Sequence, residues 1–388
     1  MEAFTVNSNM STDAAPSYRW SGTIAEAHQP EGKAVEVSVA KLEKPLIIWW
    51  TPNLFPHIES GEVEINCKIG TCITSNNRTL QNDPRTSAFI FYGTEMDVED
   101  MPIPREKNHR WALLHEESPM NNYILSHNLG LRLFNYTSTF SRRSDYPLTT
   151  QYIPSINYLI ERKPVELKIK NELRKKGFAP VLYIQSNCNV ASDRDRYIIE
   201  LSKYIQIDSY GECLQNKTLP KHLSTSENFN STEFLDYISQ YKFHLAFENA
   251  ICDDYISEKL FRALHVGSIP IYRGSPSVED WLPSTTSAIL THDYLNPKEL
   301  AKDILRIDQD DELYNTYLNY KEPDGFANDF LEEHLAKREW GEFISGFECY
   351  VCDQLLLKED TDKKQAELAG CPEPQPAFGK IQDLPPDD

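Results

Sequence analysis

The stretch from Tyr241 to Ser275 constrains the fold most, because it reads as strand, loop, helix and strand in one run. Phe243, Leu245 and Phe247 alternate with His244 and Ala246, and this period of two predicts a short strand. A polar loop follows the strand. The alternation therefore places one strand directly before a segment that is rich in charge.

The segment after this loop predicts a helix and then a second strand. Ser257 is well placed as the N-cap, because its hydroxyl can accept from a free N–H of the first turn. Leu260 and Leu264 lie on one apolar face, and Gly267 can adopt the left-handed conformation that ends a helix. Ser268 to Tyr272 is the next strand. Two strands joined by a helix make a parallel unit.

Polar residues crowd the carboxyl end of the first strand and the start of the helix, where open α/β sheets bind ligands. They are Glu248, Asn249, Tyr255, Glu258 and Lys259. Helix N-termini attract phosphate groups, and Lys259 adds a full charge. The alternative interpretation is a capped surface helix with solvated charges.

A second unit of the same kind precedes the first. Val181 to Gln185 predicts a strand, a polar loop follows, a helix begins at about Arg196, and Ile207 to Tyr210 returns as a strand. Two polar loops would therefore line the same sheet edge. The first half of the chain predicts a helix at Asn121 to His127, and strands alternating with helices favour a parallel sheet. The predicted strands there are Lys44–Phe55, Ser87–Gly93, Trp111–His115 and Leu131–Tyr136.

Composition restricts the partners. The chain has 388 residues, 40% of them hydrophobic, which is enough for two domains with full cores. Its net charge of −20 argues against nucleic acid or an anionic membrane as a main partner, since both need a basic face. A nucleotide ligand needs only a local cluster of Lys and Arg.

Cysteines and glycosylation sequons favour an oxidising compartment. Eight cysteines are consistent with disulfides, although sequence alone allows 105 pairings. Cys349-x-x-Cys352 is alternatively a redox motif or half of a zinc site. The sequence has no second C-x-x-C motif, so a zinc site is not expected. Five N-x-S/T sequons accompany the cysteines. They begin at Asn9, Asn77, Asn135, Asn216 and Asn230.

The run FENAICDDYISEKL…SIPIYRGSP resembles the signature of the α1,3-fucosyltransferase family, glycosyltransferase family 10. Further blocks that support the resemblance are WALLHEESP, FNYTSTFSRRSDYP, LYIQSNCNVASDRDRY and DSYGEC, and together they span about residues 45 to 352. The chain is most similar to the divergent subgroup described as protein O-fucosyltransferases acting on EMI-type domains.

The resemblance implies the α/β architecture called GT-B, with two Rossmann-like domains facing a cleft. An N-terminal acceptor domain would span residues 44–160 and a C-terminal GDP-fucose-binding domain residues 180–345, joined by a linker at 161–179. Residues 1–43 are expected to be a disordered stem, and 346–388 a largely disordered tail with cysteines. The family further implies that Cys67 and Cys72 pair with the Cys349-x-x-Cys352 motif.

The implied reaction moves L-fucose from GDP-fucose to an acceptor hydroxyl with inversion. Glu117 is the expected base, with Glu116 as its close rival, and a partly dry cleft would suit the role by raising the pKa of the carboxyl group. Without the family match, the pair is two surface carboxylates on a turn. Arg194 and Lys259 are the expected cations for the departing diphosphate. Arg196 is an alternative to Arg194, because the two positions are close in the sequence.

Other residues are expected to bind the donor. These are Asn187, Tyr255 and Glu258, with Glu258 suited to sugar hydroxyls, while Asn249 shapes the loop or touches the sugar. Core packing for Tyr255 and a loop cap for Asn249 are the structural alternatives. Two further residues, Arg142 and Arg143, match a family block as donor contacts or domain-interface ion pairs.

No cofactor or metal is expected. Asp193-Arg194-Asp195 spells the D-x-D pattern that holds manganese in another transferase architecture, but such short motifs are common by chance. Here an arginine lies inside the motif and Lys259 is expected nearby, so the diphosphate charge already has partners.

The sequence is also compatible with two other functions. One is an α1,3-fucosyltransferase that acts on N-acetylglucosamine of glycans, and the other is a non-catalytic lectin or chaperone with the same fold. The partners would be GDP-fucose and an acceptor glycoprotein or disulfide-bonded domain, in the endoplasmic reticulum or Golgi lumen. Family members usually carry an N-terminal membrane anchor. None is visible here, so we infer a truncated or mis-started sequence.

Overall fold

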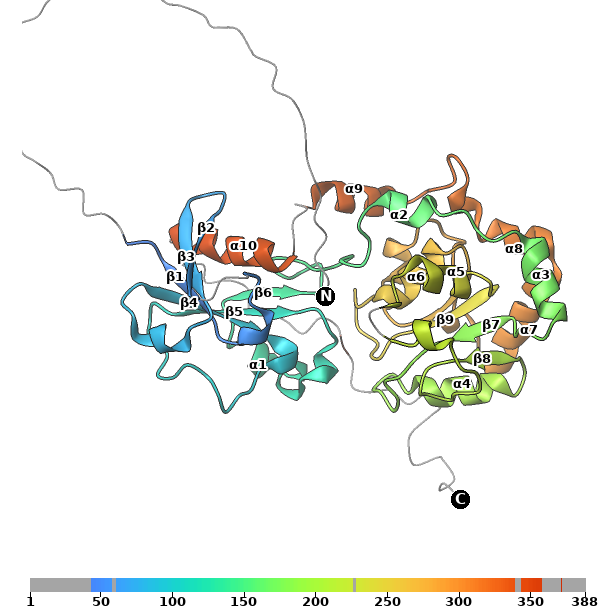
Figure 1. Cartoon of the computed structure of the whole chain (residues 1–388), viewed down its shortest axis with the longest axis horizontal. Coiled ribbons are helices and arrows are strands. Elements are labelled where there is room, and N and C mark those ends of the chain that lie inside the picture. Colours follow the sequence, from blue (N-terminus) through green and yellow to red (C-terminus); the bar gives the residue numbers. More distant parts are fainter. Residues whose placement is uncertain (1–42, 58–60, 226–227, 339–342, 358–370, 372–388) are drawn as a thin grey trace, which may run out of the picture. The chain divides into compact units, whose positions relative to one another are not determined.

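The computed structural model describes residues 43–57, 61–225, 228–338, 343–357 and Cys371. The predicted stem up to residue 42 and most of the predicted tail lie outside the described residues. Figure 1 shows that each half of the described chain is built around one sheet with helices beside it. The predicted α/β class with two Rossmann-like halves is therefore confirmed. Among the described residues, no helix has both the length and the apolar character needed to cross a bilayer.

The first sheet has the strand order β2-β3-β1-β4-β5-β6, and its only described antiparallel pair is β2 with β3. All four residues of β1 are buried, and so is nearly all of β4, as parallel strands covered on both faces require. The strands are β1 (Leu46–Trp49), β2 (Glu62–Asn66), β3 (Thr71–Ser75), β4 (Thr86–Tyr92), β5 (Arg110–His115) and β6 (Tyr136–Thr139).

Two sequence predictions in this half were wrong. The helix expected at 121–127 is a pair of short 3₁₀ turns, and the strand expected at 131–136 begins only at Tyr136. Leu131 and Phe134 are buried, but they pack under the turn that precedes β6. An apolar run thus marked burial there, not an extended backbone.

The second sheet is wholly parallel, with the order β11-β10-β9-β7-β8. Its central strand β9 is buried along its whole length. The strands are β7 (Val181–Tyr183), β8 (Ile207–Ser209), β9 (Phe243–Phe247), β10 (Ile269–Arg273) and β11 (Ile289–Leu290). The described α-helices of the chain are α1 (Asn128–Leu131), α2 (Ile156–Ile160), α3 (Leu167–Lys175), α4 (Arg194–Ser202), α5 (Thr232–Ile238), α6 (Glu258–His265), α7 (Pro297–Gln309), α8 (Asp311–Thr316), α9 (Asp329–Lys337) and α10 (Phe343–Leu357).

The β9–α6–β10 unit has the predicted local structure. Ser257 caps α6, and its Oγ accepts from the N–H of Lys259. Leu260 and Leu264 are fully buried, and Gly267 follows the helix with φ +69°. β9 and β10 pair in parallel from Phe243 and Ile269 onward. The polar loop between β9 and α6 is therefore fixed at both ends.

Helix α10 includes residues 346–357 of the predicted tail, and the rest of that tail except Cys371 lies outside the described residues. Phe347 and Val351 pack against the first sheet, and Glu348 accepts from the indole N–H of Trp49 at 2.7 Å. The helix is drawn red in Figure 1. Burial against a sheet explains its apolar composition.

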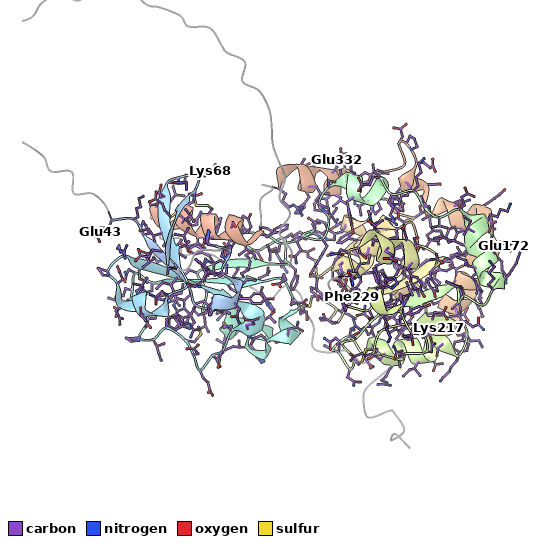
Figure 2. All side chains as sticks on the ribbon, viewed as in Figure 1. Glu43, Lys68, Glu172, Lys217, Phe229 and Glu332 are labelled. Carbon is purple, nitrogen blue, oxygen red and sulfur yellow. A yellow bond between two sulfur atoms is a disulfide. The ribbon has the colours of Figure 1, made fainter. Side chains whose placement is uncertain are left out.

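Disulfides attach α10 to the hairpin of β2 and β3. Cys67 bonds to Cys349 and Cys72 to Cys352, which confirms the pairing implied by the resemblance. Lys68, labelled in Figure 2, lies at the tip of this hairpin. The remaining cysteines form the pairs Cys188–Cys213 and Cys252–Cys371. All eight cysteines are thus oxidised.

A buried lysine on α3 holds the C-terminal end of α6. Lys170 Nζ donates to the carbonyl oxygens of Tyr241 and Gly267, both at 2.9 Å. Burial, with smaller effects of Lys242 and Lys321, lowers the pKa of Lys170 to about 7. The unfolded chain keeps this proton up to about pH 10.4. Between these pH values the unfolded state binds more protons, so this lysine makes the fold more stable as pH rises.

Replacing Lys170 by Met is expected to destabilise the fold by about 2–4 kcal/mol, because two buried carbonyl groups lose their donor. The stability difference from wild type should widen from pH 7.5 to pH 9.5, since only wild type gains from deprotonation. Urea unfolding at the two pH values measures this. Lys168→Met, at an exposed position on the same helix, is the control. A difference that does not change with pH would contradict the account.

Candidate active site

Two loops of the second sheet meet at one edge. The loop from β7 to α4 and the loop from β9 to α6 follow neighbouring parallel strands, so they leave the sheet at the same end. Ser192 in the first loop donates its N–H to Asn249 O at 2.9 Å and its Oγ–H to Glu248 O at 2.6 Å. The starts of α4 and α6 are thereby tied together.

Arg194 begins α4, two residues before the predicted start, and only 1% of it is exposed. Its Nη1 donates to Phe247 O at 2.9 Å and its Nη2 to Asn187 O at 2.6 Å. Its Nε is buried without a hydrogen-bond partner among the described residues. Arg194 therefore joins the two loops and brings a positive charge beneath them. The side chain of Asn187 is exposed.

Lys259 lies in the first turn of α6 with its side chain mostly buried. Its Nζ is 2.9 Å from Ser257 Oγ, 3.4 Å from a Glu258 oxygen and 3.6 Å from a Glu248 oxygen. Burial alone lowers the pKa of Lys259, but the charges of Glu258 and Glu248 outweigh it and raise that pKa. The charge of Arg194 opposes them, which places the two expected cations within electrostatic reach of each other.

Glu258, the first residue of α6, stays ionised. Burial on its own raises the pKa of Glu258, whereas the charges of Lys259 and Arg262 and a hydrogen bond from Ser257 lower it to about 2. As a carboxylate it can only accept hydrogen bonds. Its chemistry suits hydroxyl donors such as those of a sugar.

Glu117, on the loop after β5 of the first sheet, contacts the loop between β9 and α6. Its Oε2 accepts from the hydroxyl of Tyr255 at 2.9 Å, and Asn249 Nδ2 lies 3.5 Å from the same oxygen. Tyr255 is 3% exposed and packs edge-on against Phe140. Asn249 Oδ1 is buried without a partner among the described residues. Three of the predicted site residues thus meet at one carboxylate oxygen.

Glu116 has a different environment from its neighbour. Its Oε1 accepts from the hydroxyl of Tyr92 at 2.7 Å, within the first half of the chain. Burial raises the pKa of Glu116, although the Tyr92 hydrogen bond opposes this. A raised pKa suits a base, but the contacts of Glu117 place that carboxylate at the second sheet's loops. The geometry therefore favours Glu117 over Glu116 as the expected base.

The turn that carries both glutamates rests on His115. The buried ring of His115 donates from Nε2 to Ser118 O at 3.2 Å, which closes the turn over Glu116 and Glu117. Burial lowers the pKa of His115 to about 4, so the ring is neutral near pH 7. A Cβ at Gly93 would lie 2.6 Å from ring atoms of His115. Glycine at this position leaves the room that the ring needs.

Gly93→Ala is therefore expected to displace His115 and the turn. It should destabilise the fold by about 1–3 kcal/mol and lower turnover of the reaction that the resemblance implies about tenfold, because a small misplacement of Glu117, the expected base, is costly. Gly70→Ala is the matched control, since its Cβ would meet only the flexible end of Leu356. Melting temperature and kcat separate the two effects. Equal losses of kcat in both variants would contradict the role of this turn.

Arg142 forms the ion-pair alternative left open by the sequence. Its guanidinium is 2.6 Å from Asp254 and 2.8 Å from Asp280, and it lies over the ring of Trp281. Burial alone raises the pKa of Asp254, but Arg142 brings it below its usual range. Asp254 adjoins Tyr255, so this pair braces the loop. Arg143 is exposed.

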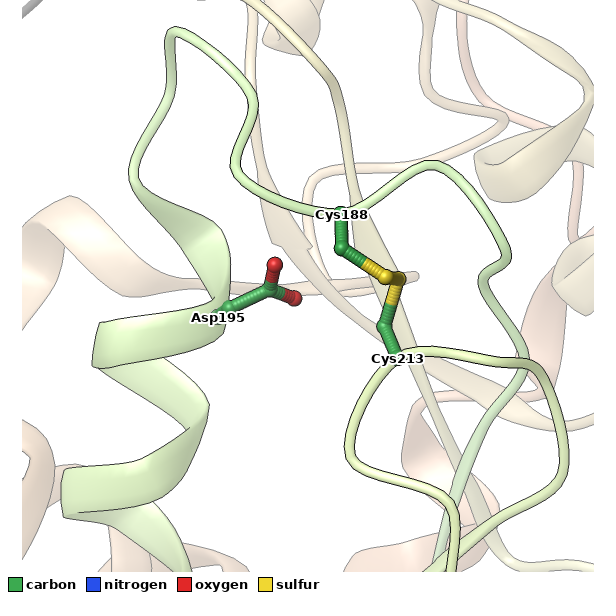
Figure 3. A group of neighbouring side chains, drawn as sticks. All are labelled: Cys188, Asp195 and Cys213. Carbon is green, nitrogen blue, oxygen red and sulfur yellow. A yellow bond between two sulfur atoms is a disulfide. The ribbon is translucent and has the colours of Figure 1, made fainter.

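The D-x-D carboxylates have local partners. Asp193 lies 3.3 Å from Arg196, and Asp195 accepts from Tyr183 Oη at 3.0 Å and from the N–H of Asn189 at 2.9 Å. Figure 3 shows Asp195 beside Cys188 and Cys213, a geometric cluster that resembles a metal site. The two sulfur atoms are joined in a disulfide, so neither is available as a thiolate ligand.

The sequence placed Glu248 among the polar residues after the strand but gave it no role, and it did not indicate Tyr152. Glu248 is fully buried beside Lys259, and the only signal was its place in the F-E-N run. Burial raises the pKa of Tyr152, with further contributions from Glu258, Glu117 and other carboxylates. Tyr152 thus lies among the acids of both halves, and no sequence pattern indicated it.

Comparisons with known proteins identify the family. Residues 173–370 match the C-terminal part of glycosyltransferase family 10 (fucosyltransferase), and residues 42–152 match the fucosyltransferase N-terminal domain. Over 347 residues the chain is 46% identical to the rat GDP-fucose protein O-fucosyltransferase 3 and 45% identical to the human one. Each alignment covers 85% of this chain and 71% of the relative.

A solved structure, an α1,3-fucosyltransferase with GDP-fucose, shares 17% identity over 86% of this chain and 96% of its own, with a TM-score of 0.48. The two family matches and the identity to the mammalian relatives are far stronger. The chain is therefore a glycosyltransferase and belongs to the family 10 fucosyltransferases.

Proposed function

We propose that this enzyme transfers L-fucose from GDP-fucose to a Ser or Thr hydroxyl of a folded, disulfide-bonded protein domain of the EMI type, with inversion at the sugar. The observation that carries the proposal is the contact of Glu117 with Tyr255 and Asn249. It sets a carboxylate of the first half against the loop that leads into Lys259. The protein acceptor is supported by the names of the mammalian relatives.

In the proposed reaction, Glu117 accepts the proton of the acceptor hydroxyl as its oxygen attacks the anomeric carbon of fucose. The bond from that carbon to the diphosphate breaks, and GDP leaves from the opposite face. A single displacement of this kind inverts the anomeric centre. A positioned base contributes about 10²–10⁴-fold to such a step.

The departing diphosphate gathers negative charge, and the starts of α4 and α6 are suited to hold it. Each offers the positive end of a helix dipole, which attracts phosphate. Lys259 supplies the cation that can reach the phosphates, and Arg194 supplies charge from below while it fixes both loops. Groups that stabilise the leaving charge accelerate the reaction because their effect is largest in the transition state.

The remaining residues would hold the donor. Glu258 is ionised and can accept from ribose or fucose hydroxyls, and Asn187 lies exposed on the loop before α4. Asn249 Oδ1 has no partner among the described residues and can accept a hydrogen bond from a hydroxyl of the sugar. Tyr255 fixes Glu117 and lines the same loop.

We further propose that transfer occurs in the lumen of the endoplasmic reticulum or Golgi. Four disulfides persist only in an oxidising compartment. Acceptors with disulfides of their own pass through the same lumen.

Mass spectrometry of candidate acceptors after incubation with GDP-fucose tests the function. A folded EMI-type domain should gain the mass of one deoxyhexose on Ser or Thr, and a reduced, unfolded domain should gain none. An N-glycan with terminal N-acetylglucosamine is the alternative acceptor. Addition to the glycan alone would refute the protein acceptor, and addition to neither would refute transfer.

We expect no divalent metal to be needed, because Lys259, Arg194 and the helix N-termini are the groups proposed to face the diphosphate. Treatment with EDTA is expected to change the initial rate of fucose transfer less than about twofold, because electrostatic stabilisation comes from protein groups. Loss of activity in EDTA with recovery in manganese would overturn this expectation.

A further inference from the structure

Glu248 is a fully buried carboxylate that follows β9 directly. Its oxygens accept from the N–H of Ser257 at 2.8 Å and from the Ser257 hydroxyl at 2.7 Å. Burial raises the pKa of Glu248, whereas the charge of Lys259 and the hydrogen bonds from Ser257 lower it. An ionised carboxylate in the interior is costly unless such charges and hydrogen bonds compensate it. The site thus keeps a costly group at a place where an apolar residue would fill the same space.

Gly274 leaves the room that the Glu248 side chain occupies. A Cβ at Gly274 would lie 2.6 Å from Glu248 Cγ and 2.3 Å from the hydroxyl of Tyr272. The backbone is fixed as well, because the N–H of Glu248 donates to Arg273 O at 2.8 Å and its carbonyl accepts from Ser192.

This carboxylate holds Lys259 by two routes. The Lys259 ammonium lies 3.6 Å from Glu248 Oε2 and donates to Ser257 Oγ at 2.9 Å, and that hydroxyl in turn donates to Glu248. Lys259 is thereby held at the start of α6 by a carboxylate and a hydroxyl that face it from the interior. Glu258 provides a further contact from its own helix.

We propose that Glu248 is a positioning residue that holds the Lys259 ammonium in place for the diphosphate and balances its charge against Arg194. The inference rests on the proposed function, in which Lys259 faces the donor. Without Glu248, two cations would share a buried site with less compensation, and the ammonium would lose its anchor.

The groups that face Lys259 explain why its charge depends on Glu248. The negative groups are Glu248 and Glu258, with Glu117 farther away, and the positive one is Arg194. Removing one of the two close carboxylates lets the ammonium lose its proton at lower pH. The affinity for GDP should fall at high pH, where Lys259 loses its proton, and we call this fall the alkaline limb of GDP binding. In Glu248→Gln the alkaline limb should therefore move to lower pH.

The experiment is a double-mutant cycle with Glu248→Gln, Lys259→Met and the pair, read by kcat and by calorimetric titration of GDP from pH 7 to pH 10. Glu248→Gln is expected to lower kcat about tenfold or more, the cost of a misplaced charged group. In the Lys259→Met background the same change should alter kcat less than about twofold, since the residues act as a unit.

Glu348→Gln is the matched control, because Glu348 is equally buried and hydrogen-bonded but belongs to α10. It should lower the melting temperature and leave the alkaline limb unchanged. Should Glu248→Gln fail to fold, Ser257→Ala keeps the carboxylate and removes the bridging hydroxyl, and it should also move the alkaline limb to lower pH.

Equal losses of kcat in both backgrounds, with the alkaline limb unmoved, would overturn the inference and leave Glu248 a structural group. That result differs from failure of the proposed function, in which wild-type protein neither binds GDP nor transfers fucose. An interaction between the two substitutions together with a shifted limb supports the assignment.

Discussion

Glu117→Gln is expected to lower kcat for fucose transfer about 10³-fold, within the range that a positioned general base supplies. Glutamine keeps an oxygen for the Tyr255 hydroxyl, so the loop between β9 and α6 should stay in place. The affinity for GDP should change less than about threefold, because no contact with the diphosphate depends on this carboxylate. Rapid-quench kinetics and calorimetry measure the two quantities separately.

Glu116→Gln is the matched control for this prediction. Glu116 accepts from Tyr92 inside the first half of the chain, and its removal should lower kcat less than about tenfold, as an indirect effect on the turn. If Glu116→Gln abolishes transfer and Glu117→Gln does not, the roles are exchanged. Unchanged turnover in both variants would remove the base from this turn altogether.

The general base also determines the direction in which kcat/KM changes with pH. A general base acts only when deprotonated, so kcat/KM should fall as pH drops through the pKa of that base. This acid limb should be lost in Glu117→Gln, whose residual activity no longer depends on a carboxylate. A limb that remains unchanged in Glu117→Gln but disappears in Glu116→Gln would assign it to Glu116, whose pKa burial raises.

Lys259→Met is expected to lower kcat about 10²-fold or more and to weaken GDP binding about tenfold, since the diphosphate would lose the cation proposed to hold it. The substitution also leaves Glu248 buried without its ion pair, which should destabilise the fold by about 3 kcal/mol or more. Adding Glu248→Gln should restore much of the melting temperature without restoring kcat. This separation distinguishes the catalytic contribution of Lys259 from its structural one.

Lys302→Met is the control for charge alone, because Lys302 is exposed on α7 and pairs only with Glu299 among the described residues. It should leave kcat and GDP affinity unchanged. If Lys259→Met binds GDP and transfers fucose like wild type, the diphosphate is held elsewhere and the proposed site is wrong.

Local signals predicted the β9–α6–β10 unit to within a residue at its ends. Alternating apolar residues, the Ser257 cap and Gly267 each act within a few positions, so sequence alone is enough for them. Helix α10 was missed in part, because its apolar residues face a sheet formed near the start of the chain. The β2–β3 hairpin was missed because its strands are largely polar.

The candidate site, like the fold, was predicted from the sequence only in part. The residues of each loop were found from their own runs, but the contact of Glu117 with Tyr255 joins positions 138 residues apart. Which of two adjacent glutamates points at that loop depends on the turn closed by His115 over Gly93. The sequence placed Glu248 among the polar residues of the loop but not in a role, since its burial and its pairing with Lys259 appear only once the loop is folded.

A crystal structure of the GDP complex would show where the diphosphate binds. We expect the diphosphate at the joined starts of α4 and α6, with a phosphate oxygen within about 3 Å of Lys259 Nζ, the usual length of a charge-assisted hydrogen bond. The Glu117 carboxylate should face the side from which the acceptor approaches. A diphosphate bound away from both helix starts, or one that Lys259 does not touch, would contradict this expectation.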